Sequence, residues 1–335
     1  MHWALSSALT ALVAYRALTR KSLTFGGILA AVGTAVIHAI HPFSTLNICL
    51  LFGFYLVGNS ATKHKHAIKQ SLTVSADGSH TVTTRTHIQV FSNSICASVL
   101  ILLHYYLIQD DLKSGKEITF SLLPGGENGW RDALIVGVMT QYAAVLSDTL
   151  SSELGILSRS PPRLIYNPLK VVPPGTNGGV TLTGFLAGTA GSILISAISL
   201  LSLPFAEGSD VSFKATLGGV IIASGVIGTI VDSLLGATLQ ASVIDVKAGK
   251  VVESEGGEKV LVTSRKYPSL EGQVRKRVGG AGEGRVVAET KAVGGDHGSR
   301  EIFNGFDLLS NNGVNVVMAG IVAVGGVGWG YWVSQ

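Results

Sequence analysis

The chain has 335 residues, of which 47% are hydrophobic and only 14% are charged, and its formal net charge is +4. Soluble domains usually carry about 25% charged residues, so this composition excludes an ordinary soluble protein. The 2 cysteines both lie in apolar runs, which excludes a disulfide-linked secreted domain. Apolar runs of about 20 residues, enough for a helix to cross a bilayer, recur along the chain. We therefore expect an all-α polytopic membrane protein.

Eight apolar segments predict about eight transmembrane helices. The first is interrupted by Arg16, but another apolar segment follows it at once, which favours a membrane helix over a cleaved signal peptide. The seventh carries a carboxylate, Asp232, near its far end. The segments cover approximately residues 2–18, 23–41, 43–60, 88–108, 131–150, 179–203, 215–238 and 310–333.

The basic residues are distributed unevenly between the predicted loops. The loops that follow the first, third, fifth and seventh segments hold 21 of the 25 Lys and Arg residues. Even without the long last loop, the short loops after the first, third and fifth segments hold 10 Lys and Arg residues, against 4 in the other loops. The positive-inside rule therefore predicts that these four loops face the cytosol and that both termini lie on the other side.

The last basic loop divides the chain into three predicted parts. Residues 1–239 form a membrane domain with seven spans, residues 240–306 form an insert, and residues 307–335 form the last span. In the insert, the runs SVIDV, KVLVTSR and GRVVAETKAV alternate apolar and polar residues between glycine-rich breaks. This pattern is typical of short strands joined by turns. We expect a small β-rich cytosolic insert that packs on the membrane body.

Polar side chains gather at the predicted cytosolic ends of several spans. An ionisable group inside a span costs about 2.5–3.5 kcal/mol on insertion scales, which makes it a candidate functional residue. Three spans contribute carboxylates at one depth, and this coincidence predicts a cytosol-facing pocket. The acidic residues are Asp148, Glu153, Asp232 and Asp307, and the neutral residues that accompany them are Thr149, Ser152, Gln89, Asn93, Ser233, Gln240, Asn311, Asn312 and Asn315.

The carboxylates predict a magnesium site. Mg²⁺ is usually held by one or two protein carboxylates together with substrate phosphates and water. On a continuous helix, Glu153 lies about 140° round the axis from Asp148. The two can converge only if the helix breaks near residues 150–152; otherwise Asp232 is the better partner for Asp148.

The stretch PPGTNGG, residues 173–179, predicts a phosphate-binding turn. Its glycines tolerate positive φ, its consecutive backbone N–H groups can form an anion-binding nest, and a helix begins directly after it. It is not a Walker loop, because no G-K-[ST] follows. The predicted phosphate-binding residues are Gly175, Thr176, Asn177, Gly178 and Gly179.

Each of these features also has a purely structural interpretation. Asp148 could be a helix end at the membrane interface, and Asp232 a buried carboxylate satisfied by neighbouring hydroxyl groups. The turn could simply lead the chain into the next span, and the asparagines before the last span could cap its helix. The shared level of these residues favours one joint site over four unrelated features.

Four motifs, SDTLSSELG, PPGTNGGVTLTG, DSLLGATLQ and FDLLSNNGVN, carry a resemblance in their order and separation. Together with GFYLVGNSATKHKHAIK and RTHIQVFSNS, they resemble the integral membrane family that includes plant phytyl-phosphate kinase and animal transmembrane protein 19. The resemblance covers residues 25–333, approximately. It implies a membrane prenyl-phosphate kinase that transfers a phosphoryl group from CTP or another nucleoside triphosphate to an isoprenoid monophosphate, such as phytyl or geranylgeranyl phosphate.

The resemblance and the polar residues together imply a distribution of roles. Phosphoryl transfer needs mainly metal, positioning and neutralisation of charge. A phosphate monoester is already largely ionised near neutral pH, so no strong base is required. The prenyl tail is expected between glycine-lined helices. The implied residues are Asp148, Asp232 and Glu153 for Mg²⁺, Gly175–Gly179 and Lys170 for the triphosphate, and Lys63 and Arg85 for the acceptor phosphate.

Two functions of other classes remain open. An ion-coupled transporter predicts polar groups spread across the depth of the membrane, whereas the outward half of each span reads as almost purely apolar. A non-catalytic scaffold would use the basic insert to bind anionic lipid or a partner. The expected partners of the kinase are the prenyl phosphate, the nucleotide and membrane lipid, with no nucleic acid, and a homodimer is compatible with the sequence. We expect the endoplasmic reticulum membrane, with the catalytic face in the cytosol.

Overall fold

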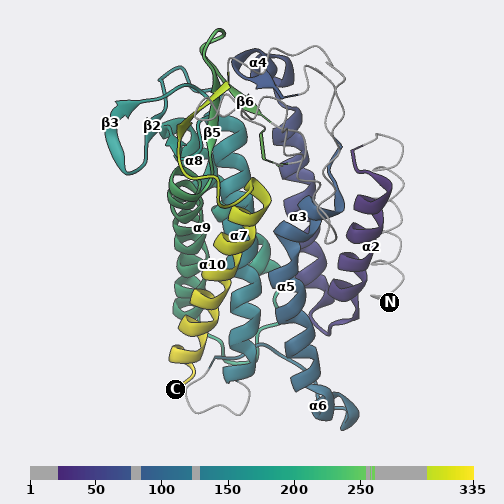
Figure 1. The fold of residues 1–335 in the computed structure, drawn as a ribbon. Helices are drawn as coiled ribbons and strands as arrows, with labels where there is room; N and C mark the ends of the chain where they lie inside the picture. Colours follow the sequence, from purple (N-terminus) through teal and green to yellow (C-terminus); the bar gives the residue numbers. More distant parts are fainter. Residues whose placement is uncertain (1–21, 77–83, 123–128, 254–256, 258, 261–299) are drawn as a thin grey trace.

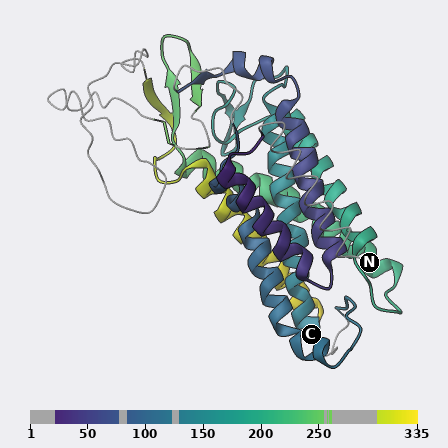
Figure 2. The same ribbon diagram turned by 90° about the vertical axis from the view of Figure 1, so that its right-hand side faces the viewer.

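The computed structural model describes residues 22–76, 84–122, 129–253, 257, 259–260 and 300–335. Within these ranges the protein is a bundle of long helices that carries two small sheets at one end (Figures 1 and 2). The chain enters and leaves this end repeatedly, so segments far apart in sequence meet there.

Long apolar helices form the bundle, as the hydropathy predicts. Six of those in the described ranges are long and apolar enough to cross a membrane, and α2 is apolar but has only 16 residues. The helical membrane class is therefore confirmed with six candidate spans. The predicted segment 2–18 lies outside the described residues. The helices are α2 Phe25–Ile40, α3 Ser44–Lys63, α5 His87–Leu107, α7 Gly129–Gly155, α8 Leu182–Ser202, α9 Val211–Leu239 and α10 Asn311–Val333.

Two helices extend beyond their predicted ends. Helix α9 begins at Val211 because the Asp210 side chain caps it, accepting a hydrogen bond of 2.6 Å from the backbone N–H of Phe213. Helix α7 continues to Gly155, where its last turn packs closely on Gly184 at the start of α8. The polar sequence after Asp148 therefore remains helical instead of forming a loop.

Helix α7 is the centre of the bundle. Within its most apolar stretch 89% of the residues are buried, against 33–39% in the other candidate spans. Its neighbours α3, α5, α8, α9 and α10 surround it. Small residues permit this close packing: a Cβ atom at Gly228 of α9 would overlap Ala144 of α7. Small residues at such contacts are typical of helix packing in membranes.

The strands form two sheets beside the helix ends. In one sheet the order is β1-β6-β5-β7, with β1 parallel to β6 and the other pairs antiparallel; in the other it is β3-β2-β4, antiparallel throughout. The strands are β1 Val74–Ser75, β2 Arg163–Leu164, β3 Asn167–Val171, β4 Gly179–Val180, β5 Ser242–Asp245, β6 Lys250–Glu253 and β7 Arg300–Asn304, and the short helices are α4 His66–Leu72 and α6 Gln109–Lys113.

The first sheet joins the predicted insert to the membrane body. The run SVIDV forms β5, as expected, whereas GRVVAETKAV and most of KVLVTSR lie outside the described residues. The sheet also takes β1 from the segment between α3 and α5, and Arg300 of β7 donates a hydrogen bond of 2.8 Å to the carbonyl of Ala76. The strands of residues 240–306 thus depend on a partner strand from the N-terminal half of the chain.

Candidate functional site

A polar cavity of about 580 Å³ opens at the end of the bundle that carries the sheets. It is bounded by the ends of α3, α5, α7, α8, α9 and α10, with β4 and β6 beside them. Most of the residues that the sequence singles out line it. They are Asp148, Thr149, Ser152, Glu153, Asp232, Ser233, Gln240, Gly175, Thr176, Asn177, Gly178, Gly179, Arg85, Gln89, Asn93, Asn311, Asn312 and Asn315.

Three of the singled-out residues lie away from the cavity lining. Lys63 is exposed at the end of α3. Lys170 lies on the exposed strand β3, with its ammonium 5.0 Å from the centre of the Phe303 ring. Asp307 forms an ion pair of 2.8 Å with Lys259. None of the three therefore faces the other candidate residues.

Asp148 of α7 and Asp232 of α9 form the central pair of the cavity. Their carboxyl groups lie within hydrogen-bonding reach of each other. Among the residues described, no group donates to Asp232 Oδ1, although this atom is fully buried. Two adjacent carboxylates repel each other and are stable together only if a proton or a cation lies between them. The pair is thus suited to a positively charged ligand.

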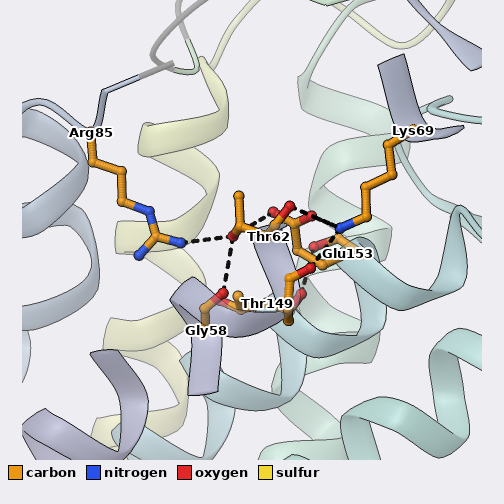
Figure 3. Close-up of polar contacts among 8 residues, drawn as sticks. Gly58, Thr62, Lys69, Arg85, Thr149 and Glu153 are labelled. Carbon is orange, nitrogen blue, oxygen red and sulfur yellow. Dashed lines mark hydrogen bonds and ion pairs between the residues drawn. The ribbon is translucent and has the colours of Figure 1, made fainter. Parts of the chain in front are cut away.

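Glu153 does not join this pair, because α7 runs unbroken through residues 150–152. Its carboxylate instead accepts a hydrogen bond of 2.6 Å from Lys69 and one of 2.9 Å from the hydroxyl of Thr62. The same hydroxyl accepts a hydrogen bond of 2.9 Å from the guanidinium of Arg85 (Figure 3). The chain Lys69–Glu153–Thr62–Arg85 therefore fixes the position of Arg85 at the cavity wall.

Lys69 was missed in the sequence, although it lies in the motif GFYLVGNSATKHKHAIK. Lys65 has φ +48°, a left-handed conformation that ends α3 and turns the chain into α4. This turn directs Lys69 back to the end of α3, where its ammonium also donates to the carbonyls of Ala61 at 2.7 Å and Thr62 at 3.3 Å. A lysine that binds the last carbonyls of a helix is favoured by the helix dipole. Lys69 is therefore the lysine of this motif that pairs with a residue of the cavity lining, Glu153, whereas Lys63 is exposed.

Two further ionisable groups at the cavity have shifted pKa values. Burial lowers the pKa of Arg85, while the charge of Glu153 acts in the opposite direction, and arginine remains protonated in proteins. Burial raises the pKa of Glu253, a residue of β6 that the sequence did not single out, and a hydrogen bond with Thr73 opposes this shift. The cavity thus combines a fixed positive charge with carboxylates on several elements.

The PPGTNGG turn lies against the helix that carries Asp232. Gly178 has φ +72°, and a Cβ atom there would overlap Ala237 and the carbonyl of Ser233 on α9. Only glycine meets both requirements. The turn therefore comes close to the carboxylate pair, as the sequence suggests.

The same turn offers fewer free donors than a full nest. The N–H groups of Thr176 and Gly179 bond to carbonyls within the turn, and that of Asn177 bonds to the Ser242 hydroxyl at 2.9 Å. The short turn closes on itself and is tied to β5, which explains the difference from the expected run of free N–H groups. In the part of the chain that is described, the N–H groups of Gly175 and Gly178 have no partner.

Helix termini add positive potential. Helices α5, α8 and α10 begin beside the cavity, whose lining includes Gln89 in the first turn of α5, the α8 cap Thr181, and Asn311. The N-terminus of a helix carries about half a positive charge and binds anions such as phosphate. Three such termini beside an arginine favour a ligand with several negative charges.

The residues present fit a magnesium ion that is shared with a bound substrate. The described residues contain no group of three or more His, Cys, Asp or Glu side chains that would form a complete metal centre. They do contain the Asp148–Asp232 pair with its unpaired oxygen. Two carboxylates are the usual protein contribution where phosphates and water complete the shell of Mg²⁺.

Comparisons with known proteins agree with this architecture. The family model "Integral membrane protein DUF92" matches residues 8–323. Protein PGR of Arabidopsis thaliana is 35% identical over 252 residues, which is 74% of this chain and 82% of that protein. An uncharacterized membrane protein of Methanocaldococcus jannaschii is 42% identical over 106 residues, which is 32% of this chain and 40% of that protein.

A third relative is an uncharacterized membrane protein of Synechocystis sp., 34% identical over 121 residues, or 34% of this chain and 41% of that protein. No solved structure matches the chain significantly. The family model covers nearly all of the chain, which confirms the membership that the sequence motifs had indicated. The chain belongs to the DUF92 family of integral membrane proteins.

Proposed function

We propose that this protein is a membrane-embedded, Mg²⁺-dependent kinase that transfers a phosphoryl group from CTP, or another nucleoside triphosphate, to an isoprenoid monophosphate such as phytyl or geranylgeranyl phosphate. The observation that carries the proposal is the Asp148–Asp232 pair, which lines a polar cavity beside the partly buried Arg85 and includes a carboxylate oxygen with no hydrogen-bond partner among the described residues. The motif resemblance described above supplies the class of acceptor.

Each polar element has a part in this reaction. Asp148 and Asp232 would hold Mg²⁺, which neutralises the charge on the transferred group when it is bound. The turn around Gly178 and the start of α8 would contact the triphosphate. Arg85 would bind the acceptor phosphate, since a guanidinium matches phosphate geometry through paired N–H donors. Lys63 and Lys170 have no part, because they lie outside the cavity lining.

Glu153 has a positioning role in this scheme. Its carboxylate is held by Lys69 and Thr62, so it is not available as a metal ligand without breaking an ion pair. The acceptor phosphate is itself the nucleophile and needs no general base. The reaction therefore depends on the geometry of the pocket and on the neutralisation of charge.

The assay uses the purified full chain in lipid nanodiscs with Mg²⁺, γ-labelled CTP or ATP, and phytyl or geranylgeranyl phosphate. We expect labelled prenyl diphosphate from the wild type and none above background from Asp148→Asn or Asp232→Asn. Asp210→Asn is the matched control, because Asp210 caps the opposite end of α9 and asparagine also caps helices well. Absence of transfer to any prenyl phosphate from either nucleotide contradicts the proposal.

One observation favours a transporter as the second candidate. The sequence suggested that the outward half of the bundle is almost purely apolar. The structure differs from this, because helix packing buries polar side chains there. Asn47 is fully buried, and neither its amide nitrogen nor its amide oxygen has a partner among the residues described; the hydroxyl of Ser199 also lacks one. Proton or sodium flux into proteoliposomes that is lost in Asp232→Asn, without any label transfer by the wild type, would favour this alternative.

The distribution of basic residues supports an orientation in the membrane. We propose that the cavity opens to the cytosol and that the protein resides in the endoplasmic reticulum membrane. The short basic loops of the described part flank the cavity end of the bundle, which is the cytosolic side under the positive-inside rule. Arg159 is exposed, so a cysteine can replace it and be labelled with a membrane-impermeant reagent. Labelling that occurs only after the plasma membrane is opened supports the proposal. A fluorescent fusion that marks another organelle contradicts the choice of membrane.

A further inference from the structure

A second, apolar groove of about 80 Å³ lies between α2, α3 and α5. Its walls are formed mainly by hydrocarbon side chains, including Ile28, Ala31 and Val32 of α2, Leu51 of α3 and Val90 of α5. Its small volume suits one narrow chain better than the two acyl chains of a glycerolipid. The groove lies in the membrane-spanning part of the bundle, where a hydrocarbon ligand would enter from lipid.

The groove and the polar cavity share part of their walls. Phe54, Arg85, Gln89 and Asn93 line both. Arg85 is the charged member of this shared wall. Its guanidinium donates a hydrogen bond to the hydroxyl of Thr62 (Figure 3), and the residue lines both spaces. A ligand with a negative head and an apolar tail would satisfy both sides of this junction.

The other polar side chains of the groove do not require a polar ligand. The hydroxyls of Thr34 and Ser94 lie 3.3 Å apart and bond to each other, and that of Ser94 also donates to the Val90 carbonyl at 2.9 Å. The hydroxyl of Tyr55 lies 3.4 Å from that of Ser22, within hydrogen-bonding distance. Away from the junction, the groove therefore presents hydrocarbon. This pattern is matched by an isoprenoid chain, which carries no hydrogen-bonding group beyond its phosphate.

We infer that the α2/α3/α5 groove binds the first part of a single isoprenoid chain and that Arg85 holds the phosphate of this lipid at the edge of the polar cavity. This inference rests on the proposed function and names the acceptor subsite within it. The groove then selects for chain length, because a chain too short to reach α2 gains no contact there. Burial of apolar surface drives this binding.

The kinetic test narrows the groove with Ala31→Phe. We expect at least a tenfold loss of kcat/KM for geranylgeranyl phosphate and less than a twofold change for dimethylallyl phosphate, whose short chain ends near the junction. Leu29→Phe is the matched control, because Leu29 lies on the exposed face of α2, outside the groove, and should leave both substrates unaffected. An equal change for both substrates, or no change, overturns the inference.

A labelling test on the wild-type protein needs no variant. A geranylgeranyl phosphate analogue with a diazirine on its chain should label peptides of α2, α3 or α5 on irradiation, and unlabelled geranylgeranyl phosphate should compete with it. Labelling confined to other helices overturns the inference. If the wild type transfers no phosphate to any acceptor, the kinase proposal fails, but labelling of the groove still decides whether the lipid binds there.

Discussion

Two clusters of polar residues lie at opposite ends of α7, and they differ in how completely their hydrogen bonds are satisfied. Asp132 lies in the first turn of this helix and Asp148 lies 16 residues further on, about 24 Å along the axis. At the first end, Asp132 accepts hydrogen bonds of 3.0 Å from His104 and 2.7 Å from the backbone N–H of Ser121. At the second end, Asp148 and Asp232 face each other with an unpaired oxygen.

The first cluster closes into one consistent chain of donors. The Phe43 N–H donates 3.0 Å to Nδ1 of His41, so the proton of this ring is on Nε2 and is donated over 2.8 Å to Nδ1 of His104. His104 in turn donates from Nε2 to Asp132. Each ring nitrogen has one partner, and both rings can be neutral. We call this chain the histidine network.

The contrast teaches that burial alone does not identify a functional acid. Asp132 is 2% exposed and is more deeply buried than Asp148 or Asp232, which are partly buried. Among the described residues, the histidine network leaves no buried side-chain polar atom without a partner, which is typical of a structural cluster. The carboxylate pair combines an unused acceptor with a large polar space, and this combination is typical of a site.

The first prediction separates the two clusters by activity. Asp232→Asn should lower the rate of phosphoryl transfer by about 10²-fold or more, because one metal-binding oxygen is lost. The midpoint of thermal unfolding should stay the same or rise, since the substitution removes repulsion between two carboxylates. Label transfer and unfolding are measured on the same preparation. A marked loss of stability with normal transfer per folded molecule contradicts the assignment.

The second prediction is that a change in the histidine network lowers stability and leaves phosphoryl transfer nearly unchanged. Asp132→Ala should lower the free energy of unfolding by about 3 kcal/mol, because His104 and the Ser121 N–H lose their acceptor inside the bundle. Transfer per folded molecule should stay within about twofold, because the network lies far from the cavity. Urea or thermal unfolding in detergent measures the change. Asp132→Asn, which keeps an acceptor for His104, should have a smaller effect, and equal effects would contradict the role of that bond.

The third prediction concerns the chain that fixes Arg85. Lys69→Met should lower transfer by about 10-fold to 100-fold, as is typical when a supporting partner of a site residue is lost. The loss should appear mainly as a higher KM for the prenyl phosphate, because Arg85 is displaced through Glu153 and Thr62. The double variant Lys69→Met/Glu153→Gln should recover part of the activity, since it removes the unpaired charge. No recovery would indicate that Lys69 acts in another way.

The fourth prediction tests the turn beside the carboxylate pair. Gly178→Ala should cost about 1–3 kcal/mol of stability and should raise KM for the nucleotide, because the methyl group forces the turn away from α9. Gly249→Ala is the matched control: its φ is +63°, but a Cβ atom there has no neighbour within 4 Å. This control should show the cost of the backbone conformation without the change in KM. Equal KM values in both variants contradict a phosphate-binding role for the turn.

The fifth and smallest effect is a pH dependence. The pKa of Glu253 is raised in the folded protein, so the folded state binds more protons than the unfolded state at pH values above the ordinary glutamate value of 4.5. Stability should therefore decline as the pH rises from 4.5 to the raised value. Glu253→Gln should flatten this part of the curve in unfolding experiments at a series of pH values. An unchanged slope would show that Glu253 is not the titrating group.

The sequence is informative wherever a local pattern decides the structure. Hydropathy located the long helices α2, α3, α5, α7, α8, α9 and α10 within a few residues, because each must bury or present an apolar surface along its whole length. The short polar helices α4 and α6 were not predicted. The motifs around Asp148 and Asp232 also predicted their approach, since α7 and α9 run in the same direction and each carries its carboxylate near its C-terminal end. The sequence could not decide whether Asp148 is joined by Glu153, through a break in the helix, or by Asp232. The answer depends on how α7 packs on α8.

Residues that depend on a change of chain direction could not be found in this way. The left-handed conformation of Lys65 redirects Lys69 into the site, and no local pattern requires it. Lys170 and Asp307 are adjacent in sequence to site motifs, yet their side chains contact Phe303 and Lys259 instead. In the PPGTNGG turn, the N–H group of Asn177 bonds to Ser242, which lies 65 residues further along the chain. Such contacts are set by tertiary structure.

The most direct test of the central claim is label transfer from γ-labelled CTP to geranylgeranyl phosphate by Asp232→Asn and Asp132→Ala, compared with the wild type at equal amounts of folded protein. The account predicts that Asp132→Ala retains at least half of the wild-type rate and that Asp232→Asn retains about 1% or less. Equal rates in the two variants would contradict the claim that the carboxylate pair, and not the histidine network, is the functional centre.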